Sequence, residues 1–490
     1  MAEPAATAYL LLAAGLLLLV SAVLSRATAR LGVPVALAFL GIGMLSGAEQ
    51  AVRISDEDYR LAFRLGTIAL VLIVFDGGLH TPVGTLKRVL APAALLATAG
   101  VVVTAGITAL GARLAGLPWT AALLLGAVVS STDAAAVFSV LRAGSVRVVR
   151  RVSDLIELES GLNDPMAVIL TLGVTGVAAG AVRSPGELAL DVGVQLALGG
   201  LVGLAAGAGA RELLARMRPL VAGLFPVATL SIALLSFALA TVLGGSGFLA
   251  AYVTGIVLGA ARLPYQSGIL HVHDAIAWFA QVAMFLVLGS LVAPSRLLGA
   301  AGVGVAVALT LAVVARPLAV AACLVPFRLP AREVAFVGWA GLRGAVPIVL
   351  ATIPVMSRVP GSERLLDVVF FVVVVNAFLP GATLRHVTRR LGVESDEAPP
   401  PRAVLEITTS QRLDRDVLAF HVSAASAVAG ATLAELPLPA GALVMLIVRG
   451  AELIAPRGAT QLLPGDHVYV LCRPEEQPEV KLMLGQLEET

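Results

Sequence analysis

Long apolar segments separated by short polar connections fill the first 384 positions of the chain. A helix that crosses about 30 Å of hydrocarbon needs roughly 20 apolar residues. Thirteen segments meet or approach this length, at approximately residues 8–25, 31–48, 62–79, 89–111, 119–141, 156–180, 188–209, 220–240, 246–260, 274–293, 297–325, 333–356 and 365–384. The pattern predicts an α-helical polytopic membrane protein with about 13 transmembrane helices surrounded by membrane lipid.

The amino-acid composition supports this interpretation. Hydrophobic residues make up 58% of the 490 positions and charged residues only 13%, whereas soluble domains carry about 25% charged residues. The formal net charge of +2 gives no reason to expect a nucleic-acid partner. Cys323 and Cys472 lie in unlike segments, so no disulfide is expected. Residues 8–25 follow no basic region, and we expect a retained span rather than a signal peptide.

Basic residues are divided unequally between the two sets of connections. If the thirteen segments alternate across the membrane, one face carries seventeen Lys and Arg residues and the other carries eight. Lys and Arg concentrate on the cytoplasmic side of membrane proteins. We therefore expect a multi-pass protein of the cell membrane, with the amino terminus outside and the carboxyl terminus in the cytoplasm.

The odd number of segments has a consequence for symmetry. Segments 1–6 and 8–13 can form two six-helix units that are separated by one helix and therefore inverted relative to each other. Inverted repeats are typical of secondary transporters. This expectation rests on counting, because the sequences of the two halves are not obviously similar.

The carboxyl-terminal part of the chain has a different composition. Residues 391–402 are polar and rich in proline, which is typical of a linker. Beyond them, β-prone runs at residues 417–422, 443–448, 452–454 and 467–471 alternate with turn sequences. We predict a transmembrane domain at 1–390 and a small cytoplasmic α+β domain at 403–490.

The first polar cluster inside an apolar segment is Ser130-Ser131-Thr132-Asp133. Short polar side chains compete with helical hydrogen bonds, and unwound backbone at membrane depth is tolerated where it lines a cavity or is buried in protein. The cluster predicts a broken helix. Thr132 or Asp133 is expected to cap the half-helix that follows.

The second cluster is Glu159-Ser160-Gly161-Leu162-Asn163-Asp164-Pro165, with Glu157 just before it. A carboxylate at the depth of Asp164 is costly and indicates a functional site. Ser160 and Asp164 are four residues apart and share a helix face. Oxygen ligands suit hard cations, so this face predicts a site for a monovalent cation.

The third cluster, Gly341-Leu342-Arg343-Gly344-Ala345-Val346-Pro347, predicts a second broken helix. It lies seven segments after the first break, as the inverted repeat requires. Arg343 keeps its charge and needs a carboxylate when it is buried. Glu159 is the expected partner, in a structural ion pair.

These three motifs together resemble the NhaP-type monovalent cation:proton antiporters, over essentially all of residues 1–390. Many relatives have Pro directly after the Thr-Asp pair, where this chain has Ala134. The resemblance implies that Asp164 exchanges proton for cation and that Asn163 partners Asp133 and Thr132. It also implies that Ser160 and Thr132 contribute ligands, and that a core domain moves against a dimerisation domain in a homodimer.

The tail resembles the TrkA-C domain, which is attached to many potassium transport systems. The resemblance rests on Gly430-Ala431-Thr432-Leu433-Ala434-Glu435-Leu436-Pro437, Pro456-Arg457-Gly458 and Leu463-Pro464-Gly465-Asp466. It favours the potassium/proton branch of the antiporters. It implies a regulatory role and a nucleotide-type regulator at residues 403–490, and we expect no other cofactor. A folded appendage that only stabilises the dimer is the alternative.

The residues and the resemblance lead to one mechanism. Proton and K⁺ compete for Asp164, and an empty charged site is held back from crossing by desolvation. Asn163 supplies no second proton, which favours electroneutral one-for-one exchange, and the protein is not expected to be an enzyme. A Na⁺ (or Li⁺)/proton antiporter is the alternative. A regulated channel would need a filter such as TVGYG, and an intramembrane protease using Asp133 and Asp164 would need a Gly-x-Gly-Asp signature; neither motif occurs.

Overall fold

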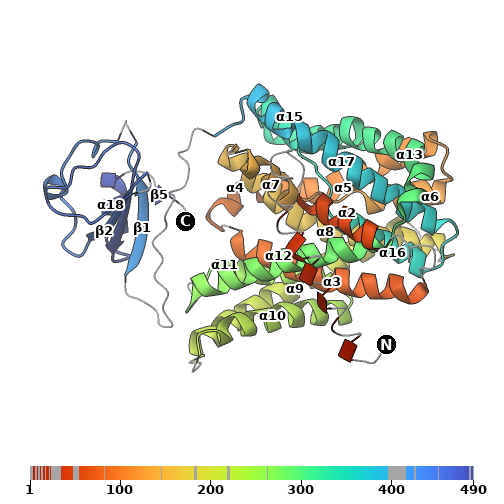
Figure 1. The fold of residues 1–490 in the computed structure, drawn as a ribbon, viewed down its shortest axis with the longest axis horizontal. Helices are drawn as coiled ribbons and strands as arrows, with labels where there is room; N and C mark the ends of the chain where they lie inside the picture. The colour runs from red at the N-terminus through yellow and green to blue at the C-terminus, as the bar shows by residue number, and fades with distance from the viewer. Residues whose placement is uncertain are drawn as a thin grey trace. The chain divides into compact units, whose positions relative to one another are not determined.

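The computed structural model comprises a large helical unit, which ends at Ser395, and a small unit at the carboxyl terminus (Figure 1). It describes residues 35–47, 55–81, 83–144, 146–180, 185–217, 221–261, 263–395, 415–423, 426–450, 452–484 and 487–488, with scattered residues between 4 and 23. Much of the predicted helix at 8–25 and of the linker at 391–402 lies outside the described residues.

Helices occupy the twelve other predicted segments. The unbroken ones are α2 (Val35–Gly47), α3 (Asp56–His80), α8 (Arg150–Ala178), α9 (Pro185–Arg216), α10 (Leu224–Val242), α11 (Gly247–Gly259), α12 (Gln266–Ser290) and α17 (Ser362–Leu391). Within the described residues, eight helices are long and apolar enough to cross a membrane, and four shorter apolar helices accompany them. The polytopic α-helical fold is confirmed, whereas the total of thirteen helices is not established.

Both predicted breaks are present. The fifth segment divides into α6 (Trp119–Val128) and α7 (Ala134–Ala143), and the twelfth divides into α15 (Ala331–Trp339) and α16 (Val346–Met356). Asp133 is the N-cap of α7, as expected. The break in the fifth segment therefore forms with Ala134 in place of proline, because the capping carboxylate ends the unwound stretch.

Two further segments contain π-helical turns that the sequence pattern does not reveal. The fourth consists of α4 (Val83–Leu95), η2 (Leu96–Gly100) and α5 (Val101–Leu114). The eleventh consists of α13 (Pro294–Leu309), η3 (Thr310–Ala315) and α14 (Arg316–Leu324), followed by η4 (Val325–Phe327). These segments are seven crossings apart, and α5 packs on η3 while α14 packs on η2. The breaks and the π turns thus occupy corresponding positions in the two halves.

Glycines bring several helices into backbone contact. A Cβ atom at Gly78 of α3 would overlap the carbonyl oxygen of Tyr252 in α11, and one at Gly255 of α11 would overlap the carbonyl oxygen of Phe75. Small residues allow this close approach in membrane helices, where packing replaces the hydrophobic effect. Helices α3, α9, α10 and α11 therefore form a closely packed group, and α9, α10 and α11 lie side by side in Figure 1.

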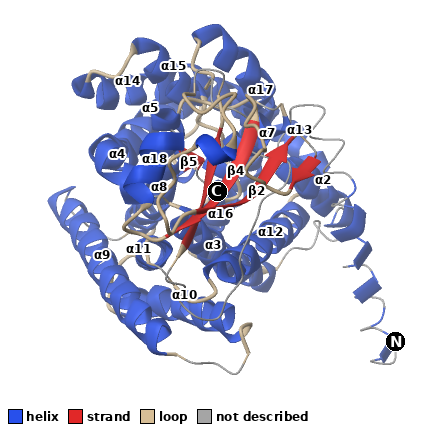
Figure 2. Cartoon of the chain, turned by 90° about the vertical axis from the view of Figure 1, so that its left-hand side faces the viewer, coloured by secondary structure: helices blue, strands red, loops and turns tan. Residues whose placement is uncertain are grey.

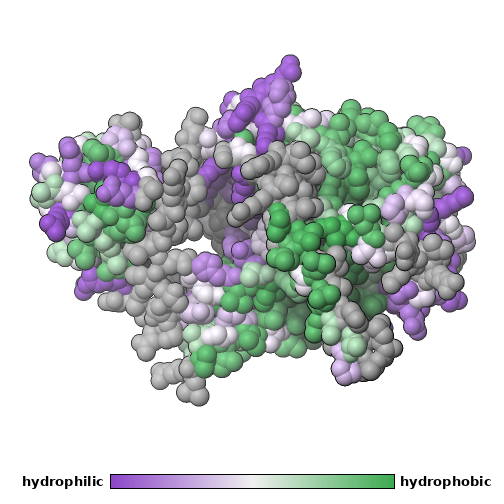
Figure 3. Space-filling view, in the orientation of Figure 1, coloured by the Kyte–Doolittle hydropathy of each residue, from purple (hydrophilic) through white to green (hydrophobic). Residues whose placement is uncertain are grey.

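The outer surface of the helical unit is apolar. Hydrophobic residues cover much of the face shown in Figure 3, and large side chains such as Leu298 (82% exposed) and Val242 (84% exposed) point outward. Exposed apolar surface of this extent marks an interaction site in a water-soluble protein. On helices of this length it suits contact with lipid.

The small unit holds a five-stranded antiparallel sheet, shown in red in Figure 2. Its strands are β1 (Asp416–His421), β2 (Leu443–Arg449), β3 (Glu452–Ile454), β4 (Asp466–Cys472) and β5 (Leu487–Glu488), in the order β3-β2-β4-β1-β5. Helix α18 (Gln477–Leu484) packs on one face, over Phe420, Ile447 and Val468. The four predicted strands are confirmed within one or two residues. Strand β5 and helix α18 were not predicted from the sequence.

Neighbouring glycines of α3 allow a matched test of the backbone contact with α11. We expect Gly78→Ala to destabilise the protein by about 1–3 kcal/mol, because a methyl group there overpacks the interface. Gly77→Ala is the control, since a Cβ at Gly77 has no atom within 4 Å, and it should be neutral or stabilise by up to about 1 kcal/mol. Thermal unfolding in detergent measures both; equal unfolding temperatures would contradict the packing.

Candidate functional site

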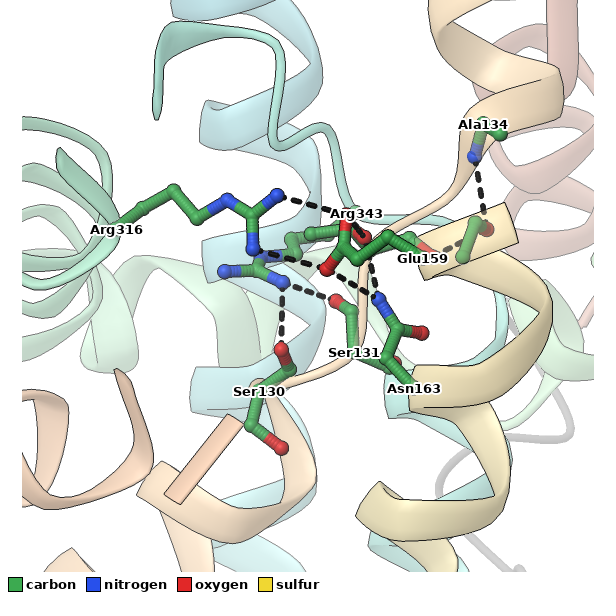
Figure 4. A network of polar contacts seen from close by, with 9 residues as sticks. Ser130, Ser131, Ala134, Glu159, Asn163, Arg316 and Arg343 are labelled. Atoms are coloured by element: carbon green, nitrogen blue, oxygen red, sulfur yellow. Dashed lines mark hydrogen bonds and ion pairs between the residues drawn. The ribbon is translucent and has the colours of Figure 1, made fainter. Parts of the chain in front are cut away.

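The two broken helices meet at their unwound stretches. The backbone N–H of Asp133 donates to the carbonyl oxygen of Leu342 at 2.9 Å, which joins the break between α6 and α7 to the break between α15 and α16. Each break leaves backbone groups without helical partners. At membrane depth these groups need partners inside the protein, and the surrounding polar side chains supply them (Figure 4).

Charged side chains complete the ends of the half-helices. Nη1 of Arg343 donates to the carbonyl oxygen of Ser130 at 2.9 Å and also to that of Ser131, just beyond the end of α6. The carboxylate of Asp133 accepts from the N–H of Ala136 at 3.0 Å, at the start of α7. A cation at a helix C-terminus and an anion at a helix N-terminus both oppose the local dipole charge. The break is therefore held open electrostatically.

Gly344 is required for this crossing. A Cβ atom at Gly344 would overlap the carboxylate of Asp133. Pro347 follows in the first turn of α16, where a missing N–H removes no helical hydrogen bond. The glycine and proline in the third motif thus have separate structural purposes.

The predicted ion pair between Glu159 and Arg343 is wrong. The carboxylate of Glu159 instead accepts two hydrogen bonds from Arg316, from Nη1 to Oε1 at 3.0 Å and from Nη2 to Oε2 at 2.8 Å. The two side chains are 1% and 4% exposed. Arg343 turns to the carbonyl groups at the end of α6, because these unpaired acceptors lie within its reach.

The sequence analysis missed Arg316, although a signal for it exists. It is an arginine inside the apolar segment 297–325, directly before Pro317, and it begins the helix that follows η3. An intramembrane arginine needs a partner as much as an intramembrane acid does. A Cβ at Gly341 would overlap the side chain of Arg316, so the third motif also makes room for it.

Asn163 connects this ion pair to the unwound backbone. Its Nδ2 group donates to Thr132 Oγ1 at 2.5 Å and to Glu159 Oε1 at 2.9 Å. The hydroxyl of Thr132 in turn donates to Glu159 Oε2 at 3.2 Å. The expected contact with Thr132 is confirmed, whereas the amide bonds to Glu159 rather than to Asp133.

Ser160 fastens helix α8 to the first break. Its hydroxyl donates to the carbonyl oxygen of Thr132 at 2.9 Å and accepts from the N–H of Ala134 at 3.1 Å. In this arrangement Ser160 and Thr132 hold the crossing together. Their part as cation ligands remains a prediction.

Asp164 lies beside this network and faces a cavity of about 480 Å³. The residue is 7% exposed, and its Oδ1 atom has no hydrogen-bond partner among the described residues. Thr132, Asp133 and Ser160 line the same cavity, whereas Glu159, Asn163 and Arg343 do not. The structure thus divides the predicted residues into a group that faces the cavity and a supporting group that is buried away from it.

Further polar residues line the cavity toward the ends of α3 and α7. Glu157 and Asp76 are half-buried there and Asp274 is exposed; the two aspartates were not predicted from the sequence. His80 and Arg142 also line it and are exposed. Because exposed residues occur at this end, the cavity connects Asp164 with solvent along a path rich in carboxylates. Oxygen donors of this kind suit a hard cation.

The chain is similar to known protein families and proteins. Residues 15–390 match the family described as sodium/hydrogen exchanger, transmembrane, and residues 417–485 match the TrkA-C domain. The chain is 39% identical over 478 residues to the K⁺/H⁺ antiporter NhaP of Alkalimonas amylolytica, which covers 97% of this chain and 83% of that protein. It is 38% identical over 479 residues to the K⁺/H⁺ antiporter NhaP2 of Shewanella oneidensis.

More distant proteins are also similar. The Na⁺/H⁺ antiporter NhaS2 of Synechocystis is 28% identical over 335 residues, which are 66% of this chain and 61% of that protein. The sodium proton antiporter MjNhaP1 of Methanocaldococcus jannaschii shares the fold, with a TM-score of 0.65 and 23% identity, over 78% of this chain and 100% of that chain.

The buried ion pair between Glu159 and Arg316 predicts an effect on stability. Arg316→Met leaves the Glu159 carboxylate buried without its cation, and we expect a loss of about 3–5 kcal/mol in the free energy of unfolding. Arg316→Lys keeps a charge but not the two-pronged geometry, so a smaller loss is expected. Thermal unfolding in detergent measures both. If Arg343→Met destabilised the protein and Arg316→Met did not, Glu159 would depend on Arg343 after all.

Proposed function

The chain belongs to the sodium/hydrogen exchanger family and is a cation/proton antiporter of the NhaP kind, and we propose that it exchanges K⁺ for protons, one for one, at Asp164. One observation carries the proposal: a buried carboxyl group with an unpartnered oxygen faces a cavity where two broken helices cross. A carboxylate in such a place must take up either a proton or a cation, because leaving it bare is costly.

Competition for one carboxylate explains coupled exchange. When Asp164 is protonated it attracts a cation weakly, and when it is deprotonated it binds one. The site crosses the membrane readily when it is loaded and neutral, and an empty charged site is held back by desolvation. Net flux of one ion therefore requires counter-flux of the other.

The charges around the site support a ratio of one to one. Glu159 is neutralised by Arg316. Asp133 and Arg343 each oppose the dipole of a half-helix, and their charges offset each other. Asn163 is an amide and does not ionise near neutral pH. Asp164 is then the carboxyl group whose charge changes during the cycle.

Potassium is the preferred ion in this proposal because the relatives of 38–39% identity are named K⁺/H⁺ antiporters. Na⁺ is the second candidate, supported by the names of NhaS2 and MjNhaP1. Oxygen atoms of the cavity-lining residues Asp133, Ser160, Thr132 and Asp164 suit either ion. The half-saturating concentrations of K⁺ and Na⁺ for exchange, measured side by side, decide between them.

The membrane orientation follows from the unequal distribution of basic residues. We place the amino terminus outside and the carboxyl terminus in the cytoplasm. In this orientation the ends of α3 and α7, where the cavity meets solvent, face the cytoplasm, and we assign the conformation to an inward-open state. A core that carries Asp164 would move against a dimerisation domain in a homodimer to reach the other side.

The domain assignment follows the composition and the family matches. Residues 1–390 form the transport domain, residues 391–402 a linker, and residues 403–490 a cytoplasmic TrkA-C domain that regulates exchange. A nucleotide-type regulator of that domain is part of the proposal. No catalytic role is assigned to any residue.

The assignment of Asp164 has a direct test. We expect Asp164→Asn to abolish exchange, because the amide neither binds a cation well nor releases a proton. Dequenching of a pH-sensitive dye in proteoliposomes on addition of K⁺ measures the rate. Glu57→Gln, which removes one exposed carboxylate of α3 outside the cavity, should leave the rate unchanged. A wild-type rate in Asp164→Asn would end the assignment.

Competition predicts how the cation requirement depends on pH. Where Asp164 is mostly protonated, each unit of acidification should raise the half-saturating K⁺ concentration about tenfold, since one proton must leave for each cation bound. Raising the pH should lower that concentration until the carboxyl is fully ionised. Initial rates in proteoliposomes at a series of pH values measure this. A half-saturating concentration that is independent of pH would refute competition, and a rate that changes with an imposed membrane potential would refute the one-to-one ratio.

A further inference from the structure

The chain leaves the helical unit through a short β-type contact, which we call the clip. It consists of residues 147–149, between α7 and α8, and residues 393–395, after α17. The N–H of Val149 donates to the carbonyl oxygen of Val393 at 3.0 Å, and the N–H of Ser395 donates to that of Arg147 at 2.9 Å. Val148 and Glu394 lie opposite each other as an antiparallel bridge.

The clip is fixed on the side of α17. Gly392 ends that helix with a φ of 61°, a conformation that suits glycine, and turns the chain toward the loop. Val393 is 1% exposed and Val148 is 8% exposed. Their burial stabilises a contact that two hydrogen bonds alone would hold weakly.

The loop on the other side of the clip is fastened to its surroundings as well. Nε of Arg385 in α17 donates to the carbonyl oxygen of Val140 near the end of α7, at 3.1 Å. Arg151 at the start of α8 pairs with Glu333 of α15, with Nη2 and Oε2 2.6 Å apart. The position of the loop is therefore set jointly by α15 and by the end of α17.

This loop joins the two helices that carry the exchange site. Asp133 caps the far end of α7, and Asp164 lies in α8 about 21 Å from its start, at 1.5 Å per residue. The start of α7 is also joined to the interior of α8 through Ser160. A change in the loop reaches Asp133 and Asp164 through two stiff elements.

We propose that the clip couples the carboxyl-terminal unit to the exchange site. Residues 393–395 lie at the start of the linker (residues 391–402) that leads to that unit, so a change transmitted along the chain from that unit reaches the clip first. A closed clip holds α7 and α8 in the geometry that binds the cation. An open clip loosens Asp133 relative to Asp164 and weakens cation binding. The inference rests on the proposed function, and it assigns to the linker junction the route by which the tail regulates exchange.

A lockable clip tests this in the full-length chain. Opposed residues of this bridge type have Cα atoms about 4.5 Å apart, within the range that a disulfide spans, so V148C with E394C should lock the clip on oxidation. The native Cys323 is buried. Cys472 is replaced by Ala in every variant of this series, because its buried thiol would become reactive when the small unit unfolds. The single variants V148C and E394C are controls.

The state of the tail is changed by substitution rather than by truncation. Phe420 is fully buried in the core of the small unit, and Phe420→Ala should unfold that unit. Leu482 of α18 is 86% exposed, and Leu482→Ala is the matched control. With a free clip, Phe420→Ala should raise the half-saturating K⁺ concentration roughly fivefold or more, the usual size of coupling between sites. With the clip locked, Phe420→Ala should have no effect, and a reductant should restore it.

Two results would overturn the inference. An equal response to Phe420→Ala in the free and locked proteins would mean that the tail acts by another route. Absence of a response with a free clip would mean that the tail does not act on the site. A locked clip that removes the response supports the inference.

A second measurement does not depend on transport. Hydrogen–deuterium exchange at the amides of Val149 and Ser395 should become faster in Phe420→Ala and remain unchanged in Leu482→Ala. If hydrogen–deuterium exchange at these amides were unchanged in Phe420→Ala, the coupling through the clip would be refuted even if Asp164→Asn abolishes transport as expected. Faster hydrogen–deuterium exchange in Phe420→Ala, together with wild-type transport by Asp164→Asn, would instead refute the proposed site and still support the coupling through the clip.

A third variant opens the clip directly. Val149 has a φ of −52°, which proline adopts without strain, and Val149→Pro removes its hydrogen bond to Val393. The half-saturating K⁺ concentration should rise as in Phe420→Ala, and Val149→Ala, which keeps the N–H group, should leave it unchanged. An unaltered value in a folded Val149→Pro protein would count against the clip.

Discussion

A carboxylate inside a membrane loses its hydrogen bonds to water, and groups of the protein must replace them. This requirement organises the transport unit. Glu159 meets it permanently, through Arg316, Asn163 and Thr132. Asp164, five residues further along α8, does not, since its Oδ1 atom has no hydrogen-bond partner among the described residues. The two acids therefore differ because of their surroundings: Glu159 is part of the framework of the site, and Asp164 is the residue to which we assign ion exchange.

The broken helices make this division possible. Unwinding at residues 129–133 and 340–345 exposes backbone groups, and Arg343 and Asp133 complete them from opposite sides. A continuous helix would hide those groups and leave both charges without partners. The same unwinding presents Thr132 and Asp133 to the cavity, so the cost of breaking two helices is offset by contacts that also shape the site.

Much of this arrangement is predictable from sequence, since runs of apolar residues and polar interruptions are local features. The positions of both breaks, the cap at Asp133 and the central place of Asp164 all follow from short motifs. The partner of Glu159 does not, because two arginines are available and only spatial proximity selects between them. Asp76 and Asp274 were not predicted for a similar reason. Each is a single acid on a separate helix, and only the fold brings them to one cavity.

The dryness of the Glu159–Arg316 contact also determines how the protein responds to salt. Mobile ions screen exposed charges over about 8–10 Å at physiological ionic strength, and the acids near the cavity entrance lie where counter-ions can collect around them. The side chains of Glu159 and Arg316 are 1% and 4% exposed, so these counter-ions do not reach the pair. Changes in ionic strength should therefore have little effect on the framework of the site, while they do affect the approach to it.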